Sequence, residues 1–222
     1  MLYLYNKEAG STQLKLDGDE HRYIFKVRRH QVDDTIYLRN LKDDFLHRYK
    51  ILHIDKKSSI LALKDSTKHD VRAKQSLHLA WCIIDPKSIE KILPSLNEMG
   101  VEKITFIYCK RSQKSFKLDF QRLEKILLNS SQQSGRSQMM TLGLSDSLEL
   151  FLKDYPFAKM LNFSEDNFIP IANIDTVVIG CEGGFHEKEV ALFKPENIIG
   201  FDTPLVLKSE SSACAVASKI LL

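Results

Sequence analysis

The sequence predicts a protein of two parts, a small β-barrel followed by an α/β domain with a mostly parallel sheet. Three observations support this fold class. The first 65 residues contain short stretches rich in β-branched and aromatic residues, separated by polar turns. A polar stretch, KDSTKHDVRAKQ at 64–75, then provides the expected linker. Beyond it, apolar stretches of strand length alternate with stretches of helical periodicity, which is the pattern of βα units.

The N-terminal domain is predicted over residues 1–70. Its expected strands lie at 35–40, 45–54 and 59–65, where apolar and polar residues alternate or β-forming residues dominate. Proline and glycine usage supports a boundary after this region, because all six prolines and seven of the nine glycines follow residue 80.

The C-terminal domain is predicted over residues 74–222. Its expected strands are 78–84, 103–109, 158–163, 176–180 and 197–201, and its expected helices are 87–100, 119–133, 145–154, 186–194 and 211–222. Pro94 is expected to interrupt or kink the first helix, and Gly100 to end it.

The overall composition excludes several classes of protein. Of the 222 residues, 43% are hydrophobic and 27% charged, so neither a disordered nor a collagen-like chain is expected. No apolar run reaches the roughly 18 residues of a membrane span, and the start lacks the pattern of a signal peptide. The four cysteines are widely spaced without a CxxC pair, which predicts a cytoplasmic protein with neither a disulfide framework nor a metal site.

Positive charge is concentrated in the first part of the chain. The net charge is +5 over residues 1–80 and −2 over 81–222, and the densest cluster is HRYIFKVRRH at 21–30. Four cations with two aromatic residues among them are typical of a surface that binds a nucleic-acid backbone. A solvated helix or strand face is the alternative.

A glycine-rich turn in VVIGCEGGFHEKE, residues 177–189, is the strongest local signal of a binding site. A buried strand ends in glycine, a Gly-Gly pair follows, and a helix then begins. Ligands of α/β proteins bind at the carboxyl ends of parallel strands, where glycine lets the backbone approach them closely. A tight turn with only a geometrical role is the alternative, and no P-loop is present.

Two further stretches could contribute to a site. In IIGFDTPLVLKSESSACAVASKILL, residues 198–222, an apolar loop leads into a helix rich in small residues, which could be a packed terminal helix or a wall of a cofactor site. Ser209 or Ser211 could cap that helix. The polar stretch NSSQQSGRSQ at 129–138 is typical of a helix C-terminus and could also contact RNA.

These motifs together resemble a known family. GCEGGF, the IIGF…LVLKSESSA tail, QQSGR, NEMGV with the following KRS, and an H-x₅-V-x-R pattern at His21, Val27 and Arg29 are similar to the bacterial 16S ribosomal RNA uridine-N3 methyltransferases. That family belongs to the SPOUT superfamily of trefoil-knotted methyltransferases, and the resemblance covers nearly the whole chain in the same order. It implies an N-terminal PUA-like β-barrel, a C-terminal knotted α/β domain, S-adenosylmethionine as cofactor, a homodimer, and 16S ribosomal RNA or the small ribosomal subunit as partner.

The resemblance also implies site residues. The cofactor-binding residues it implies are Leu161, Gly180, Glu182, Gly183, Ile199, Gly200, Leu205, Val206 and Leu207. Some positions depart from the family pattern: Cys181 replaces a proline, Leu205 and Lys208 replace arginines, Ser95 replaces a lysine and Asp33 a glycine. Lysine lacks the two-pronged guanidinium of arginine, so a bidentate contact would be lost at 208.

Catalytic roles follow from the chemistry of uridine N3, which must lose its proton before it can attack a methyl group. A general base and a cation that stabilises the deprotonated base would both help, and the candidates are Glu210 and Lys208. Glu210 could instead only accept amides at a helix N-terminus. The candidates for RNA binding are Arg22, Arg28, Arg29, Arg111 and Arg136. Another SPOUT reaction, such as ribose 2′-O methylation, and a non-catalytic RNA-binding or assembly protein are the alternatives.

Overall fold

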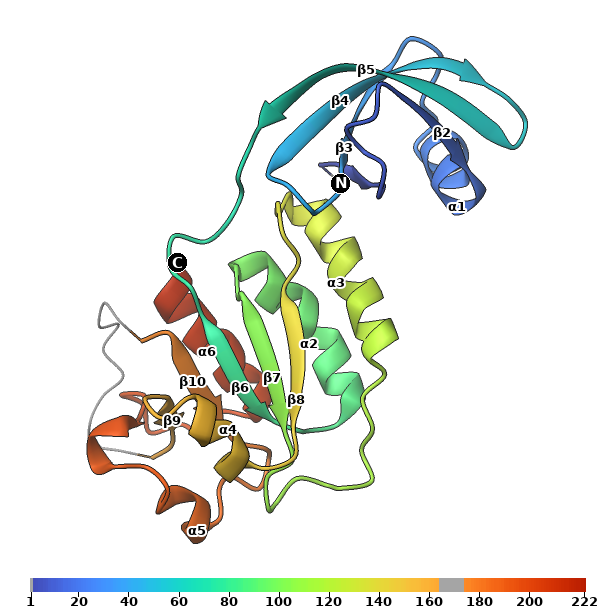
Figure 1. Ribbon diagram of the computed structural model, residues 1–222. Coiled ribbons are helices and arrows are strands. Elements are labelled where there is room, and N and C mark those ends of the chain that lie inside the picture. Colours follow the sequence, from blue (N-terminus) through green and yellow to red (C-terminus); the bar gives the residue numbers. More distant parts are fainter. Residues whose placement is uncertain (1, 164–173) are drawn as a thin grey trace. The chain divides into compact units, whose positions relative to one another are not determined.

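A computed structural model describes residues 2–163 and 174–222 of the chain. The chain forms two compact units (Figure 1). Unit 1 contains Met1–Arg72 and Leu128–Met139, and unit 2 contains Ala73–Leu127 and Met140–Leu222. The predicted domains differ from these units in one respect: residues 128–139 were expected in the second domain but pack with the first unit.

Unit 1 is a five-stranded sheet in the order β1-β3-β4-β5-β2. The strands are β1 (Leu4–Tyr5), β2 (Gln13–Asp17), β3 (Thr35–Arg39), β4 (Phe45–Ile54) and β5 (Ser58–Lys68). The three predicted strands are confirmed as β3, β4 and β5. β4 pairs antiparallel with both β3 and β5. The sheet has two edges, β1 and β2, so the predicted barrel is a curled, open half-barrel (Figure 1).

The core of unit 1 explains why the arginine and lysine side chains of the segment after β2 face outwards. Alternate strand residues such as Leu16, Leu38 and Ile51 are fully buried, and Ile24 joins them from the helical segment after β2. That segment consists of α1 (Gly18–His21) and a π-helical turn, η1 (Arg22–Val27). Because it covers the core with its apolar face, its positive side chains lie on the exposed face.

The polar stretch 129–138 has a structural place in unit 1. It contains the last residues of α3 (Phe120–Ser134), and Gly135 follows with φ +89°, a conformation that favours glycine. The Gln132 carbonyl accepts a 2.8 Å bond from the Leu2 amide, and the Tyr3 hydroxyl donates to the Arg136 carbonyl over 2.8 Å. The stretch is therefore a helix C-terminus that also holds the N-terminal strand.

Unit 2 is built on a six-stranded sheet in the order β11-β9-β10-β6-β7-β8, in which every pairing is parallel. The strands are β6 (His78–Cys82), β7 (Lys103–Ile107), β8 (Thr141–Ser145), β9 (Lys159–Leu161), β10 (Thr176–Ile179) and β11 (Ile198–Ile199). The predicted parallel α/β architecture is confirmed, and β8 is a strand that the sequence analysis did not predict. The knot implied by the family resemblance stays a prediction.

The helices of unit 2 follow the predicted order. They are α2 (Pro86–Met99), the first part of α3, α4 (Leu148–Asp154), α5 (Glu187–Val190) and α6 (Ser209–Leu221), with a 3₁₀ turn η2 (Pro195–Asn197). The helix α2 continues through Pro94, so the interruption given as one expectation is wrong, while the kink stays a prediction. Gly100 ends the helix with φ +103° as predicted. Within residues 2–163 and 174–222, no helix has the length and hydropathy that crossing a membrane would require.

The expectation of a chain without disulfides is wrong at one pair. Cys82 and Cys109 are bonded, with their Cα atoms 5.7 Å apart. Cys82 ends β6 and pairs in register with Ile107 of the neighbouring strand β7, so Cys109 follows two residues later at the same edge of the sheet. Parallel strands thus bring together two cysteines that are 27 residues apart. Cys181 and Cys214 are free.

A buried histidine at the start of β6 makes the stability of unit 2 depend on pH. Burial, with a smaller contribution from the nearby Lys103 charge, lowers the pKa of His78 from 6.5 to about 4. Because the folded pKa is the lower one, the neutral ring contributes stability above pH 6.5, and this contribution is lost as the pH falls toward 4. We expect a loss of about 2 kcal/mol in the free energy of unfolding between pH 7 and pH 5.

Urea unfolding of the wild type and of His78→Gln at both pH values measures this effect. The introduced glutamine does not titrate, and its side chain can still bond the Thr105 hydroxyl, which lies 2.8 Å from Nε2 of His78. The variant should therefore lose about 2 kcal/mol less than the wild type over this pH range. An equal loss in both proteins would assign the acid sensitivity to other groups.

Candidate functional site

A cavity of about 710 Å³ lies in unit 2 at the carboxyl ends of β9 and β10. Three segments supply most of its lining: the residues after β9, the glycine loop after β10, and the loop leading into α6. This is the edge of a parallel sheet at which α/β proteins bind ligands. Its volume falls within the range of roughly 300–1,000 Å³ typical of small-molecule sites.

The glycine loop is a tight turn whose conformation requires glycine. The Gly184 amide donates a 2.9 Å bond to the Cys181 carbonyl, and Gly184 has φ +66°. A Cβ atom on Gly180 would lie 3.2 Å from the Phe185 ring, which is closer than nearly all real contacts. The glycines of the turn therefore present backbone to the cavity, beside Cys181, Glu182 and Phe185, which also line it.

Ser209, the first residue of α6, fastens the tail to the glycine loop. Its hydroxyl accepts a 2.8 Å bond from Nε1 of Trp81 and donates to the Gly180 carbonyl. Sequence analysis suggested a helix cap, but the N-cap residue is Lys208, which makes no capping bond with its side chain. The buried Ser209 thus sets the position of the start of α6 relative to the cavity.

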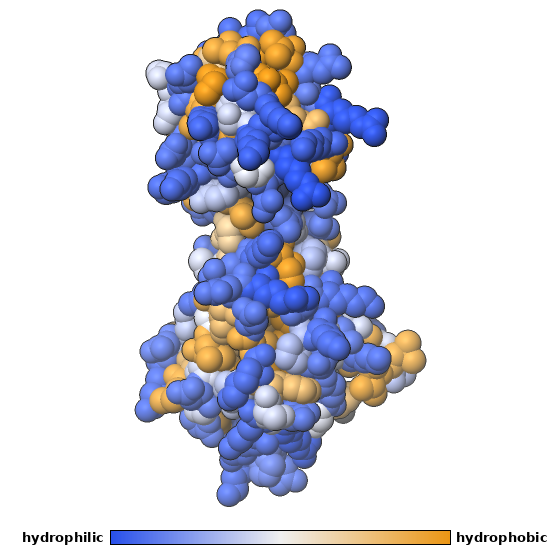
Figure 2. Space-filling model, turned by 90° about the vertical axis from the view of Figure 1, so that its right-hand side faces the viewer, coloured by the Kyte–Doolittle hydropathy of each residue, from blue (hydrophilic) through white to orange (hydrophobic). Residues whose placement is uncertain are grey.

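The loop before α6 gives the cavity an apolar side that is exposed to solvent. Leu205 and Val206 are 72% and 77% exposed, and Leu207 is 37% exposed. All three line the cavity together with Leu161 from β9. Adjacent apolar side chains in this position suit a ligand that covers them. Hydrophobic side chains are visible on the surface of this unit in Figure 2.

Three charged side chains line the same cavity: Glu182, Lys208 and Glu210. Glu182 and Lys208 are exposed, and Glu210 is half-buried in the first turn of α6. Two carboxylates can attract a cationic ligand, and a neighbouring carboxylate and ammonium can move and stabilise a proton. The predicted catalytic pair therefore lies at the same cavity as the predicted cofactor loops.

A buried carboxylate holds the glycine loop and the loop after β7 together, and the sequence analysis missed it. Glu189 is 1% exposed, and its carboxylate accepts 2.8 and 2.9 Å bonds from the amides of Lys110 and His186. Nη1 of Arg111 donates to the Gly183 carbonyl over 2.6 Å. His186 and Glu189 have the spacing of a capping box at the start of α5, so the sequence could have indicated the bond between these two residues. It gave no signal for the bond between Glu189 and the Lys110 amide.

The structure places most of the predicted cofactor residues at the cavity. Its lining includes Leu161, Gly180, Glu182, Gly183, Leu205, Val206 and Leu207, together with Lys208 and Glu210. Ile199 and Gly200 are buried and do not line it. Ile199 instead pairs with Leu161, and its carbonyl accepts a 2.9 Å bond from the Asn162 amide. These two residues support the lining rather than forming it.

The predicted RNA-binding arginines fall into three groups. Arg111 is exposed in unit 2, where it bonds to the Gly183 carbonyl. Arg22, Arg28 and Arg29 are exposed in unit 1, where Nε of Arg28 donates to the Tyr23 hydroxyl over 2.9 Å. Arg136 is only 9% exposed, and its Nε donates to the Gln138 carbonyl over 3.2 Å. A phosphate contact from Arg136 would require its side chain to leave this position.

Comparison with known proteins identifies the class of protein that this fold and site define. Residues 71–221 match the family model of the RNA methyltransferase domain, and residues 16–64 match that of the RNA methyltransferase PUA domain. A ribosomal RNA small subunit methyltransferase E of Helicobacter pylori is 38% identical over 98% of this chain and 98% of its own. The chain belongs to the ribosomal RNA small subunit methyltransferase E family.

Solved structures share the fold. The ribosomal RNA small subunit methyltransferase E of Neisseria gonorrhoeae, solved bound to S-adenosyl methionine, superimposes with a TM-score of 0.81 at 18% identity, covering 98% of this chain and 95% of the other. A Legionella pneumophila protein solved with the cofactor SAM gives a TM-score of 0.81 at 20% identity, covering 98% and 94%. At these identities the likeness concerns the fold.

Proposed function

We propose that this protein transfers a methyl group from S-adenosylmethionine to N3 of a uridine in 16S ribosomal RNA. One observation carries the proposal: a single cavity brings together the glycine loop, an apolar loop and the charged pair Lys208 and Glu210. Membership in the methyltransferase E family supports the reaction class and the ribosomal RNA substrate. N3 of uridine as the acceptor rests on the family resemblance.

The residues of the cavity fit this cofactor. Leu205, Val206 and Leu207 offer an apolar surface to its adenosine part, and the glycine loop offers exposed backbone groups. Glu182 and Glu210 supply negative charge for a positively charged ligand. When bound, S-adenosylmethionine supplies a methyl group on a cationic sulfur.

The charged pair supplies the chemistry at the acceptor. The Glu210 carboxylate accepts the proton that leaves uridine N3 and so frees the nitrogen lone pair for attack on a methyl group. A bound methyl donor would then lose its methyl–sulfur bond, with the electron pair of that bond staying on sulfur. The Lys208 ammonium stabilises the negative charge of the deprotonated base. Ser209, between them in sequence, is anchored to Trp81 and Gly180 and so holds both neighbours at the cavity.

Calorimetry with S-adenosylmethionine and nucleoside mass spectrometry test the proposal together. The protein should bind the cofactor and produce 3-methyluridine in 16S ribosomal RNA, offered both as naked RNA and as small subunits. A methyl group found on a ribose would show that the acceptor is a 2′-hydroxyl rather than N3 of uridine. RNA binding without cofactor binding would favour a non-catalytic RNA-binding protein.

RNA binding is expected to depend on the basic cluster of unit 1. Replacing Arg28 and Arg29 together with alanine should weaken binding of a 16S ribosomal RNA fragment and lower the slope of log K against log salt by roughly 1.4–1.8. Cofactor affinity should stay unchanged, because these residues do not line the cavity. Fluorescence anisotropy over a salt series measures both the RNA affinity and its salt slope. Equal slopes in the wild type and the variant would show that this cluster does not contact RNA phosphates.

We also propose a cytoplasmic location, where the ribosomal RNA substrate is made.

A homodimer formed through unit 2 is a further part of the proposal. Leu222 at the end of α6 and Phe157 after α4 are 86% and 85% exposed, and such apolar side chains are suited to an interface. Light scattering of the full chain at micromolar concentration should give the mass of a dimer. A monomer under these conditions would contradict the dimer.

A further inference from the structure

The loop after β7 carries an isolated group of positive charges. We call residues 110–118 the cationic loop; its sequence is KRSQKSFKL, with four cations and no carboxylate. Lys110, Arg111, Lys114 and Lys117 are all exposed. The surrounding part of the chain has the opposite sign, because residues 81–222 have a net charge of −2 although they include this loop.

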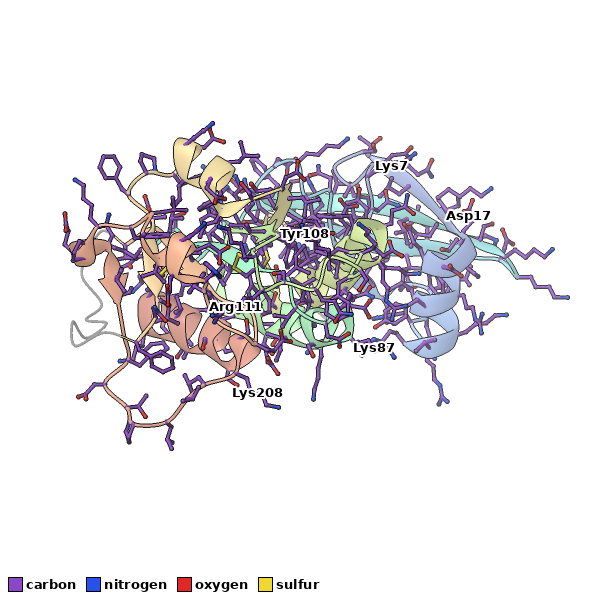
Figure 3. All side chains as sticks on the ribbon, turned by 90° about the horizontal axis from the view of Figure 1, so that it is seen from below. Lys7, Asp17, Lys87, Tyr108, Arg111 and Lys208 are labelled. Carbon is purple, nitrogen blue, oxygen red and sulfur yellow. A yellow bond between two sulfur atoms is a disulfide. The ribbon has the colours of Figure 1, made fainter. Side chains whose placement is uncertain are left out.

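The cationic loop is held in a defined shape by bonds within it and at its start. The Phe116 amide donates to the Gln113 carbonyl over 3.0 Å, and the Tyr108 hydroxyl donates to the Phe116 carbonyl over 2.9 Å. Nζ of Lys117 lies 5.6 Å from the centre of the Tyr108 ring. Figure 3 labels Tyr108 and Arg111 in this region.

The same loop is fastened beside the cavity. The buried Glu189 carboxylate accepts the Lys110 amide, and Arg111 donates to the carbonyl of Gly183, which lines the cavity. Lys114 and Lys117 are both exposed, and neither takes part in a salt bridge within the described residues, although the Lys117 ammonium lies over the Tyr108 ring. Ordered cations next to a binding cavity suit recognition of a polyanion, because little ordering is required on binding.

We propose that the cationic loop binds phosphates of the RNA backbone next to the nucleotide that enters the cavity. This inference rests on the proposed function and adds a second RNA-binding surface, located in unit 2. Lys114 and Lys117 contact phosphates, while Arg111 and Glu189 keep the loop at the glycine turn. Phosphate contacts set the position of an RNA on a protein without reading its sequence.

The variant Lys114→Ala with Lys117→Ala tests the proposal. Binding of a fluorescently labelled 16S ribosomal RNA fragment should weaken roughly tenfold or more at 0.1 M salt, and the salt slope should fall by roughly 1.4–1.8. The matched control, Lys87→Ala with Lys91→Ala on α2, removes the same charge from exposed positions of unit 2 outside the cavity lining. The control should bind RNA within about twofold of the wild type, and both variants should bind S-adenosylmethionine like the wild type.

Equal RNA affinity in the two double variants would contradict the proposal that the cationic loop binds RNA. That outcome differs from failure of the proposed function, which would appear as wild-type protein that binds no S-adenosylmethionine or transfers no methyl group. If the wild-type protein showed no methyl transfer, a loss of RNA affinity confined to the loop variant would still support RNA binding by the cationic loop. A loop variant with lost cofactor affinity would contradict the proposal, because the effect would then come from the cavity.

Discussion

Glu210→Gln is expected to lower kcat for methyl transfer by roughly 10²–10⁴-fold, the usual contribution of a general base. The amide keeps the size of the side chain but cannot accept the N3 proton. Glu210 lines the cavity in the first turn of α6, which Ser209 anchors, so the substitution should leave the site in place. Single-turnover rates with saturating cofactor and RNA measure the effect.

A matched control separates this role from a general effect of lost negative charge. Glu196→Gln removes a carboxylate from η2, which does not line the cavity, and should leave kcat within about twofold. Calorimetry on Glu210→Gln should still detect cofactor binding. A kcat close to that of the wild type would show that Glu210 is not the general base and only interacts with amides at the N-terminus of α6.

Gly183→Val is expected to weaken S-adenosylmethionine binding at least about tenfold, which corresponds to about 1.4 kcal/mol. A Cβ at this position would lie 3.4 and 3.5 Å from Cβ and Cδ of Arg111, which is ordinary contact. The two further methyl groups of valine place a branched side chain beside the Arg111 stem, at a position where the backbone lines the cavity. A ligand could then no longer approach the backbone of the turn closely.

Gly183→Ala provides the graded control, since alanine adds only the Cβ atom that the site can accommodate. It should bind the cofactor within about threefold of the wild type, a smaller loss than the tenfold effect expected for valine. Circular dichroism should give native spectra for both variants. Equal affinities in a folded valine variant and the wild type would contradict a role for this loop in cofactor binding.

The pattern of burial explains which elements could be predicted from the sequence. β6 is buried at every residue and β4 buries every second residue from His47 to Ile51, and both were predicted within a few residues of their observed ends. β1 has two residues and β2 five, the latter within a polar stretch, so their apolar signal is weak. β8, TLGLS, is only partly buried and carries a glycine, which weakens the strand pattern.

The candidate site was predictable where its residues are adjacent in sequence. The glycine turn and the apolar loop each have a local pattern, and both line the cavity. Contacts between distant residues left no such pattern. Ser209 bonds to Trp81 across 128 positions, and Glu189 bonds to Lys110 across 79. The Cys82–Cys109 pair likewise depends on which two strands become neighbours in the sheet.

The bond between Trp81 and Ser209 has a consequence for synthesis of the protein. It joins a strand from the first half of the chain to a helix that ends at Leu221, and α6 packs against α2 and β10. The cavity of unit 2 is therefore incomplete until synthesis has passed residue 209. Contacts of such high sequence separation also favour slow folding. A nascent chain stalled before residue 209 lacks Ser209 and Glu210 of the cavity lining, so the complete cavity forms only after synthesis has passed these residues.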